Sequence, residues 1–240
     1  MAALEHVKTA LREVATPERA KTNAWFFKTA PGQYGHGDKF LGVTVPQQRK
    51  VARKYYKTLS LEAVEQLLLS PWHEERLSAL FMLVLSYQNG DEAKRAQVAS
   101  LYLANTKNIN NWDLVDSSAS YILGPHLEND PYKMKLLTKL AHSNNLWERR
   151  IAMLTTCHYI KQGRADEAFV IVEILKNDSH DLIQKAVGWM LREIGKCVNE
   201  RTLTDFLGNN AATLPRTTLR YAIERLTPAQ RAKYMSRTVT

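Results

Sequence analysis

Apolar residues recur three and four positions apart along nearly all of the 240 residues, whereas alternation with a period of two never persists beyond a few positions. The first pattern places apolar side chains on one face of an α-helix, and the second would be required for a half-buried β-strand. We therefore predict an all-α fold of about a dozen helices joined by short turns. The one conspicuous loop runs from Pro31 to Gly42 and contains four glycines.

Proline and small polar residues mark the predicted helix starts, because proline is tolerated in a first turn and Ser, Thr, Asp or Asn can cap it. The starts predicted in this way are Thr16-Pro17, Val45-Pro46, Ser60, Ser70-Pro71, Asp130-Pro131, Asn199, Leu214-Pro215 and Thr227-Pro228. We predict helix ends at Asn89-Gly90 and at Gly163.

Four long helical segments, each preceded by a shorter one, resemble one another at a regular interval. They begin at Trp72, Asn111, Leu146 and Asp181. Alignment of Arg76, Asp116, Arg150 and Lys185 as equivalent positions gives steps of 40, 34 and 35 residues. Two-helix units of this size are typical of HEAT-like repeats, whose second helices line one concave face. The chain is thus predicted to form an α-solenoid, or α-α superhelix, with an irregular helical bundle as the alternative.

We expect a single domain over residues 1–240, with N-terminal helices and a loop in 1–58 and tandem helical repeats in 59–240. The 33 lysines and arginines against 24 acidic residues give a net charge of +9. Such an excess favours a polyanionic partner, nucleic acid before membrane, and predicts a basic concave face. Scattered lysines that only keep the protein soluble are the alternative.

Other features narrow the class of protein. The longest apolar run, from Ala79 to Leu85, is seven residues long, far below the ~18 needed to cross a bilayer. With no signal peptide recognisable at the start, we expect a cytoplasmic protein. Cys157 and Cys197 are too few for a disulfide framework and are expected in the core. The seven histidines show no ligand spacing, so neither a metal nor another cofactor is expected.

Lysine, tryptophan and arginine share one face of the last repeat helix. They form the series Lys185, Trp189, Arg192 and Lys196, at helical spacings i, i+4, i+7 and i+11. Phosphates would bind the cations, and a sugar or base would contact the flat indole. The alternative is a tryptophan at the edge of the apolar stripe, covered by the aliphatic stems of its neighbours.

Two further side chains are unusual for their positions. Arg150 has apolar residues one turn before and after it, so its guanidinium needs an anionic partner, either a carboxylate or a phosphate. Asp116 lies one turn after Trp112 and takes a repeat position that cations hold elsewhere. A carboxylate on a DNA-binding face opposes binding, which suggests a catalytic or positioning role. Asp113, in contrast, has a simple explanation in capping its helix.

Four segments resemble, in order and spacing, the signatures of the AlkD family of DNA alkylpurine glycosylases. They are FLGVTVPQQR (40–49), NWDLVDS (111–117), LWERR (146–150) and IQKAVGWMLRE (183–193). The resemblance covers about residues 18–197. It implies a HEAT-like fold that holds DNA on its concave face and releases N3- and N7-alkylated purines by hydrolysis, without extruding the lesion into a pocket.

The resemblance also implies roles for individual residues. The catalytic aspartate corresponds to Asp116, the two sugar-flanking tryptophans to Trp112 and Trp189, and the phosphate-binding arginine to Arg150. Contacts with the DNA backbone correspond to Thr44, Val45, Pro46, Arg49, Arg192 and Lys196. The family's pattern changes at Asn111, where one of two paired tryptophans is replaced, at Phe26, which replaces a tyrosine, and at His158, which replaces a lysine. We expect Phe26 and His158 to affect DNA affinity and lesion preference more than the chemistry.

These residues fit a glycosidic hydrolysis. An N3- or N7-alkylated purine is already cationic, so the barrier lies in the positive charge that develops on the deoxyribose, and a carboxylate facing that sugar would stabilise it. No lysine is evident for Schiff-base chemistry, so we expect a monofunctional glycosylase that acts on duplex DNA as a monomer, associated with the nucleoid when bound. The alternative is a non-catalytic HEAT-repeat scaffold that binds nucleic acid or an acidic protein.

Overall fold

The helices of the chain form two compact units, of which one ends at Ser118 and the other begins at Ala119. The computed structural model describes residues 2–236, and in this range an isolated bridge between Lys39 and Trp72 is present but no β-strand. The predicted all-α fold is therefore confirmed. The prediction of a single domain over residues 1–240 stays a prediction.

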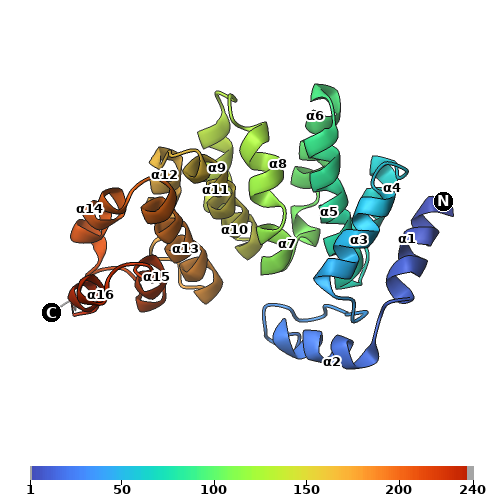
Figure 1. The fold of residues 1–240 in the computed structure, drawn as a ribbon, viewed down its shortest axis with the longest axis horizontal. Helices are drawn as coiled ribbons and strands as arrows, with labels where there is room; N and C mark the ends of the chain where they lie inside the picture. Colours follow the sequence, from blue (N-terminus) through green and yellow to red (C-terminus); the bar gives the residue numbers. More distant parts are fainter. Residues whose placement is uncertain (1, 237–240) are drawn as a thin grey trace. The chain divides into compact units, whose positions relative to one another are not determined.

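The first unit contains α1 to α7 (Figure 1). These helices are α1 (Ala2–Arg12), α2 (Pro17–Phe26), α3 (Val45–Tyr55), α4 (Leu61–Leu68), α5 (His73–Asn89), α6 (Glu92–Ala104) and α7 (Trp112–Asp116), with a 3-10 turn at Thr106–Asn108. The core of the unit is α5, which packs against α1, α3, α4, α6 and α7. Its residues from His73 to Leu83 are all buried.

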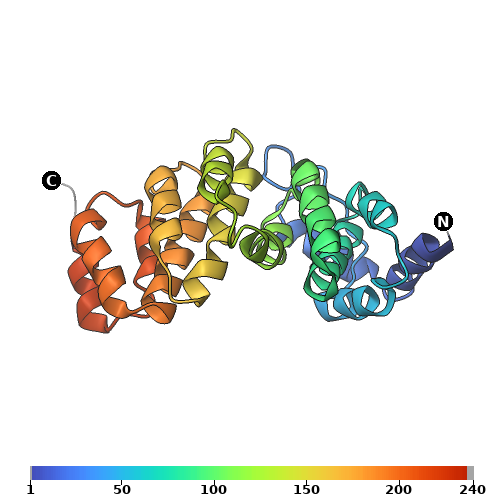
Figure 2. The same cartoon turned by 90° about the horizontal axis from the view of Figure 1, so that it is seen from above.

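The second unit contains the remaining helices. These are α8 (Ala119–His126), α9 (Lys133–Ala141), α10 (Leu146–Thr155), α11 (Cys157–Lys161), α12 (Asp166–Leu175), α13 (Asp181–Cys197), α14 (Glu200–Asn210), α15 (Arg216–Ala222) and α16 (Pro228–Met235). The helices α9 and α10 pack as one pair and α12 and α13 as the next, and like helices contact like, α9 with α12 and α10 with α13 (Figures 1 and 2). This stacking of helical hairpins is the predicted HEAT-like repeat.

Most predicted helix starts are confirmed. The side chains of Thr44, Ser60, Asn199 and Thr227 each accept a hydrogen bond from a backbone N–H of the first turn. Two starts lie two or three residues later than predicted, because a polar side chain first closes a local turn. Ser70 Oγ accepts from the N–H of Trp72 at 3.1 Å, ahead of α5, and Asp130 Oδ1 accepts from the N–H of Tyr132 at 2.7 Å, ahead of α9.

Two of the long helices predicted from the repeats are each divided in two. Between α7 and α8, Ser118 Oγ donates to the carbonyl of Leu114 at 2.6 Å, and near the end of α10, Thr155 Oγ1 donates to the carbonyl of Ile151 at 2.7 Å. A hydroxyl that bonds a carbonyl one turn back competes with the helical N–H and favours a bend. The prediction of continuous helices at these positions was wrong for this reason.

The structure also corrects the repeat alignment. Arg76, Arg149 and Gln184 each donate to a carbonyl six residues earlier, at 3.0 Å in all three cases. These three side chains are therefore equivalent, each four residues after the N-cap of its helix. The next position holds Leu77, Asp116, Arg150 and Lys185. The predicted alignment is thus right for the last three repeats and one residue off at Arg76.

The predicted loop from Pro31 to Gly42 packs against the start of α5. Both carboxylate oxygens of the buried Glu74 accept backbone N–H groups, from Leu41 at 2.8 Å and from Gly42 and Val43 at 2.9 and 3.2 Å. Gly42 has a φ of +89°, and a Cβ there would lie 2.0 Å from the carbonyl oxygen of Thr16. Glycine is therefore required where the loop passes the start of α2.

Candidate functional site

The short helix α7 carries three of the side chains that the sequence singled out. Asn111, fully buried, caps the helix by accepting the N–H of Trp112 at 2.8 Å. Trp112 and Asp116, both half-buried, follow within the same five-residue helix. Burial raises the pKa of Tyr102 on α6, its hydrogen bond with Ser118 opposes that rise, and the nearby negative charge of Asp116 adds to it. The carboxylate of Asp116 is thus close to the core of the first unit.

Trp112 belongs to an aromatic cluster. Its ring stacks on Phe27 with a centroid distance of 5.3 Å, and Phe26 meets it edge-on at 5.9 Å. Phe27 in turn stacks on Phe40 at 5.2 Å and lies 4.8 Å from the ring of His73. Phe26 is 51% exposed, so the cluster extends from the buried start of α5 to the surface at the end of α2. Trp112 is therefore held by aromatic neighbours on its inner side.

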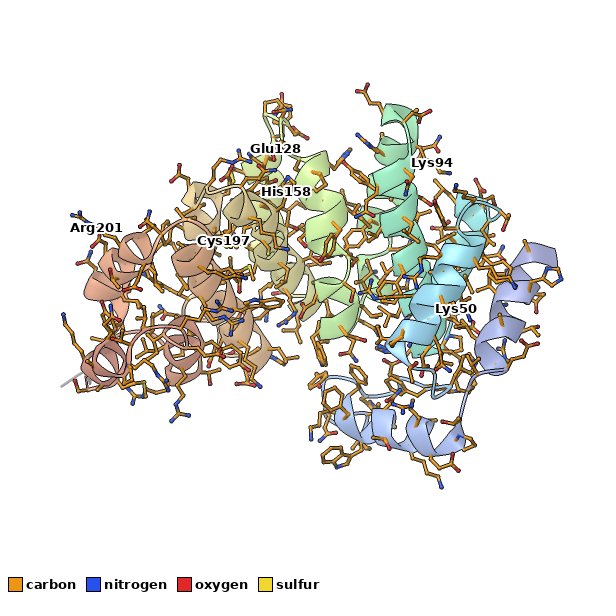
Figure 3. All side chains as sticks on the ribbon, in the orientation of Figure 1. Lys50, Lys94, Glu128, His158, Cys197 and Arg201 are labelled. Carbon is orange, nitrogen blue, oxygen red and sulfur yellow. The ribbon has the colours of Figure 1, made fainter. Side chains whose placement is uncertain are left out.

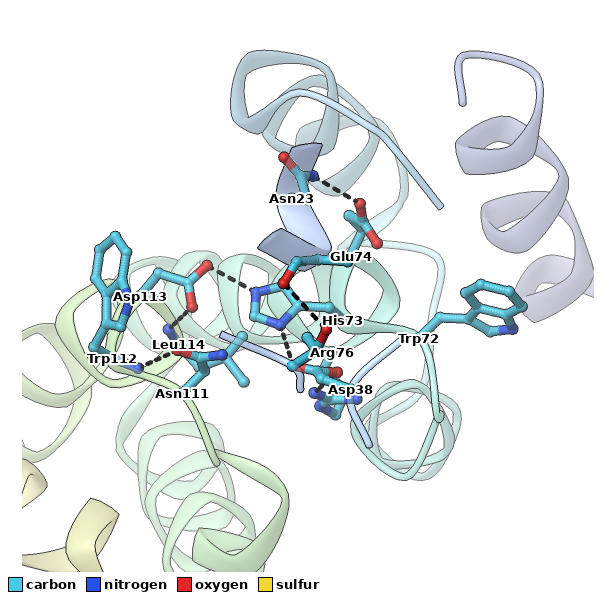
Figure 4. A network of polar contacts seen from close by, with 12 residues as sticks. Asn23, Asp38, Trp72, His73, Glu74, Arg76, Asn111, Trp112, Asp113 and Leu114 are labelled. Carbon is cyan, nitrogen blue, oxygen red and sulfur yellow. Dashed lines mark hydrogen bonds and ion pairs between the residues drawn. The ribbon is translucent and has the colours of Figure 1, made fainter. Parts of the chain in front are cut away.

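His73 also belongs to a buried ionic network (Figure 4). His73 Nδ1 is 2.7 Å from Asp38 Oδ2, and His73 Nε2 is 2.8 Å from Asp113 Oδ2. Arg76 donates to the other oxygen of Asp38 at 2.6 Å. The side chains of His73 and Asp38 are each 2% exposed. Two carboxylates and two cations therefore alternate within the core of the first unit.

The network requires a protonated histidine. Burial lowers the pKa of His73, but the carboxylates of Asp113 and Asp38 outweigh it and raise the pKa to about 9. Burial likewise opposes ionisation of Asp38, yet the hydrogen bonds and charges of His73 and Arg76 keep the pKa of this carboxyl below its usual value. At neutral pH the imidazolium donates one proton to each carboxylate.

Asp113 does more than the helix capping predicted for it. One of its oxygens accepts the N–H of Leu114 at 2.9 Å, as an acid at a helix start can, but the other binds His73. Neither His73 nor Asp38 was predicted from the sequence. One signal was available in the sequence. Four consecutive polar residues, His73, Glu74, Glu75 and Arg76, directly precede a mainly apolar stretch of the same helix. The structure buries all four.

In the second unit, Trp189 lies half-buried on α13. Its indole N–H donates to Glu193 Oε1 at 3.2 Å, one turn further along the helix. Glu193 is only 8% exposed. The polar edge of Trp189 is therefore satisfied within its own helix, as expected for a tryptophan at the margin of the apolar stripe.

Each cation of the predicted basic row has a carboxylate partner. Lys185 pairs with Asp181 at 2.6 Å, Lys196 with Glu193 at 3.6 Å, and Arg192 with Glu224 and, at 3.7 Å, with Glu193. These carboxylates were not predicted from the sequence, and Glu224 lies 32 residues from its partner. The row is on one helix as predicted, but phosphates would have to displace existing ion pairs.

Arg150 is buried, with 4% of its surface exposed. Its Nη1 donates to the backbone carbonyl of Leu182, in the first turn of α13, at 2.5 Å. This partner is a backbone carbonyl, and the carboxylate or phosphate partner expected from the sequence stays a prediction. Arg150 therefore joins α10 to α13 within the second unit.

His158 has partners of its own (Figure 3). Its Nε2 lies 2.9 Å from Glu128 Oε2 and 3.1 Å from the side-chain amide of Gln162. Desolvation opposes ionisation of Glu128, but hydrogen bonds from Arg164 and His158 lower the pKa of this carboxyl. The sequence suggested that His158 and Arg150 could point to the same side. The helix breaks between them, and His158 on α11 contacts Glu128.

The remaining predicted contacts lie at the start of α3. Thr44 caps this helix and forms a capping box with Gln47. Val45 and Pro46 follow in an exposed first turn. The guanidinium of Arg49 lies 4.1 Å from the ring centroid of Phe81. The structure thus brings Thr44, Val45, Pro46 and Arg49 together at one helix end.

Residues 2–236 contain neither a membrane span nor a metal site. No helix there is long and apolar enough to pass through a bilayer. No three acidic, histidine or cysteine side chains in the same range are grouped so that they could hold a metal ion. Cys157 is buried as predicted, whereas Cys197 is half-buried.

The stacked helical hairpins define a HEAT-like helical-repeat protein. The chain matches the protein family described as DNA alkylation repair enzyme over residues 7–226. Among solved structures it is similar to one described as a predicted DNA alkylation repair enzyme from Enterococcus faecalis. The TM-score is 0.69 at 18% sequence identity, and the alignment covers 89% of this chain and 97% of that chain. At this identity the likeness concerns the fold. No curated protein matches the chain significantly.

Because the family match spans most of the sequence, the chain belongs to the family of DNA alkylation repair enzymes. Its role is therefore in alkylation repair, for which DNA is the substrate. The resemblance stated from four short segments is confirmed by a match over residues 7–226.

Proposed function

We propose that the protein is a monofunctional DNA glycosylase that hydrolyses the N-glycosidic bond of cationic N3- and N7-alkylated purines in duplex DNA. The observation that carries this proposal is the pairing, on the five-residue helix α7, of Asp116 with Trp112. A carboxylate one turn after a half-buried tryptophan can face a sugar that the indole contacts. Membership of the alkylation repair family supplies the substrate class.

The chemistry demands little beyond electrostatics. The alkylated base leaves as a neutral purine, so the enzyme need not protonate it. Positive charge develops on the deoxyribose as the glycosidic bond breaks, and the Asp116 carboxylate stabilises that charge and orients or deprotonates the attacking water. Trp112 and Trp189 contact the sugar through their π-faces and exclude solvent. Acting from the backbone side, the enzyme has no need to take the base out of the stack, unlike most glycosylases.

The cations supply DNA affinity in this proposal. Lys185, Arg192 and Lys196 exchange their carboxylate partners for phosphates when the duplex binds. The start of α3, with Thr44 to Arg49, together with Phe26 and His158, makes further contacts to DNA. Arg150 anchors the phosphate beside the reacting sugar in this scheme, although its burial and its contact with the Leu182 carbonyl support a structural role.

One observation favours the second candidate, a binding scaffold without turnover. Every cation of the α13 row already pairs with a carboxylate. The same ion pairs would be expected in a helical repeat that has no catalytic function. A scaffold has no use, however, for the pairing of Trp112 with Asp116.

The decisive experiment measures release of free base. Purified protein is incubated with methylated duplex DNA, and free 3-methyladenine and 7-methylguanine are separated by chromatography. The proposal expects release by the wild type and none by Asp116→Asn. The matched control is Asp205→Asn, which neutralises an exposed carboxylate on α14 that pairs only weakly with Arg201 at 3.6 Å. Absence of free base with the wild type, while duplex binding persists, would establish the scaffold instead.

The expected cellular setting belongs to the same proposal. A repair glycosylase of this kind acts as a monomer in the cytoplasm and is associated with the nucleoid when bound to DNA. Fractionation of cells that express the tagged protein, with and without nuclease, tests this expectation.

A further inference from the structure

We propose that His73 is a positioning residue: held between Asp38 and Asp113, its imidazolium fixes α7 so that Trp112 and Asp116 face the sugar together. This inference rests on the proposed function of Asp116 and Trp112. It adds a part of the site that lies in the core and touches no substrate. Five observations support it.

The first is the length of α7. A helix of five residues cannot be stable by itself, because isolated helices shorter than ~12 residues are marginal in water. Its placement must come from tertiary contacts, and α5 is a helix that it packs against. The contact between His73 and Asp113 is an ionic link between these two helices, with an N–O distance of 2.8 Å.

The second observation is where that link attaches. Asp113 immediately follows Trp112 and precedes Asp116 by three residues, so all three lie within one helical turn. The Oδ1 atom of Asp113 binds the N–H of its own helix, while Oδ2 binds His73. Because Oδ1 is held within α7, a rotation of the helix about its own axis would draw Oδ2 away from His73. His73 therefore sets the orientation of the helix as well as its position.

The third observation concerns the rings. The imidazolium stacks on Phe40, with a centroid distance of 4.6 Å, and lies at a tilt beside Phe27, at 4.8 Å. Phe27 then stacks on Trp112 at 5.3 Å. His73 is thus connected to Trp112 by two routes, through the carboxylate of Asp113 and through the ring of Phe27. Both routes must be intact for the indole to keep its orientation.

The fourth observation is charge balance. With His73 protonated, the charges of Asp38, Arg76, His73 and Asp113 sum to zero, and each ring nitrogen donates to a carboxylate. Loss of the proton leaves one buried carboxylate without its donor, which is costly at a site this dry. The charged groups bonded to the ring are Asp38 from the loop and Asp113 from α7, and Arg76 from α5 binds the other oxygen of Asp38. The rings of Phe27 and Phe40, which lie against the imidazole, carry no charge.

The fifth observation extends the network to the segment that leads into the predicted DNA-contacting start of α3. Asp38 lies in the glycine-rich loop, and Glu74, next to His73, binds the backbone of residues 41–43 just before Thr44. The start of α5 therefore holds both α7 and the segment that leads into α3. A single buried cluster positions the proposed catalytic helix and the proposed DNA-contacting helix start within the first unit.

The test compares Asp113→Asn with His142→Gln. The first keeps the shape of the side chain but removes its charge and replaces one of its two acceptor oxygens by an amide NH2. The second is a control at an exposed histidine, whose ring bonds the carbonyl of Thr138 in its own helix. Single-turnover release of 7-methylguanine should slow about tenfold to hundredfold in Asp113→Asn, as for a misplaced catalytic group. Duplex affinity should stay within about twofold because the substitution removes no group that binds phosphate.

The pH profile separates positioning from a merely structural role. In the wild type the single-turnover rate should fall as pH rises through the pKa of His73. In Asp113→Asn this fall should move to lower pH, because one of the two carboxylates that hold the proton is gone. Substrate alone at each pH corrects for spontaneous loss of the base. A wild-type rate that is flat over this range, or an Asp113→Asn profile that coincides with that of the wild type, would overturn the inference.

A readout without turnover distinguishes failure of this inference from failure of the proposed function. In protein labelled with 15N-tryptophan, the indole N–H of Trp112 is assigned by its loss in Trp112→Phe. This resonance should shift in Asp113→Asn and stay in place in His142→Gln. If the wild type releases no base yet the resonance shifts, the proposed function fails and the positioning stands. An unmoved resonance would overturn the positioning, whatever the activity.

Discussion

The indole N–H of Trp189 is bonded to the carboxylate of Glu193, at 3.2 Å and one helical turn away. Glu193 also lies 3.7 Å from Arg192 and 3.6 Å from Lys196. One nearly buried carboxylate therefore orients the tryptophan and its two cationic neighbours on α13. The hydrogen bond fixes the N–H edge of the Trp189 indole, so a face of the ring is the part that a sugar could contact.

Replacement of Trp189 by Ala should reduce single-turnover excision by about one to two orders of magnitude. Its cost in the free energy of unfolding should stay below the ~3–5 kcal/mol of a deleted core tryptophan, because Trp189 is only half-buried. Trp147→Ala is the matched control, since Trp147 is 7% exposed and should show the full cost. Urea unfolding of both variants measures the difference. An equal loss of stability in the two variants would mean that Trp189 is a core residue.

Asp116 and Asp113 should differ in what they contribute to stability. Asp116→Asn should abolish excision at nearly unchanged free energy of unfolding, and should leave duplex affinity unchanged or slightly higher because an anion is removed. Asp113→Asn should lower the free energy of unfolding by about 1.5–3 kcal/mol, the range for a hydrogen bond to a charged group. Chemical denaturation and single-turnover kinetics on the same preparations test both. A wild-type rate of excision in Asp116→Asn would show that the Asp116 carboxylate takes no part in the reaction.

Much of the fold could be predicted because helix periodicity and caps act locally. Thr44, Ser60, Asn199 and Thr227 begin helices through contacts made within three residues. The errors arose where another local effect competed: the hydroxyls of Ser118 and Thr155 bend helices that the apolar pattern presents as continuous. The alignment of Arg76 was off by one residue because its hydrogen bond to the carbonyl of Ser70 cannot be seen in the sequence.

The candidate site could be predicted only in part. Trp112 and Asp116 lie close together in the sequence, so their spacing on one helix was visible. The partners of Asp113 were not, because Asp38 and His73 are brought to it from 75 and 40 residues away by the packing of α5. Among the carboxylates that neutralise the basic row, Asp181 and Glu193 lie within one turn of their partners on α13, whereas Glu224 is distant in the sequence. Glu224 reaches Arg192 only through the contact of α13 with α15 and the turn after it.

The basic row should bind phosphates in exchange for carboxylates. Removing Lys185 or Arg192 should flatten the plot of log affinity against log salt by about 0.9 for each phosphate that is no longer bound. The structure adds the reverse expectation: Glu224→Gln removes the competing partner of Arg192 and should raise affinity for the duplex. Damaged and undamaged DNA should respond equally, because phosphate contacts do not read the base.

Titrations at four or five salt concentrations measure these slopes. Arg201→Ala is the control, since the side chain of Arg201 is 90% exposed on α14 and lies 3.6 Å from Asp205. It should change the slope little. Unchanged slopes for the row variants, or a weaker affinity in Glu224→Gln, would show that the row is a solvated face.

The stability of the protein should decline at alkaline pH because of His73. The pKa of His73 in the folded protein is raised to about 9, above the ~6.5 of an unfolded chain. A raised pKa means that the stabilisation is fully present below pH ~6.5 and is lost as pH rises through about 9, with a total on the order of 3 kcal/mol. The free energy of unfolding in urea should therefore fall between pH 6.5 and 9.5 in the wild type. In His73→Gln the same measurement should start lower and show a much smaller decline, because the group that releases the proton is absent, whereas His142→Gln should follow the wild type. Parallel curves for His73→Gln and the wild type would mean that another group causes the decline and that His73 is not held as an imidazolium between its two carboxylates.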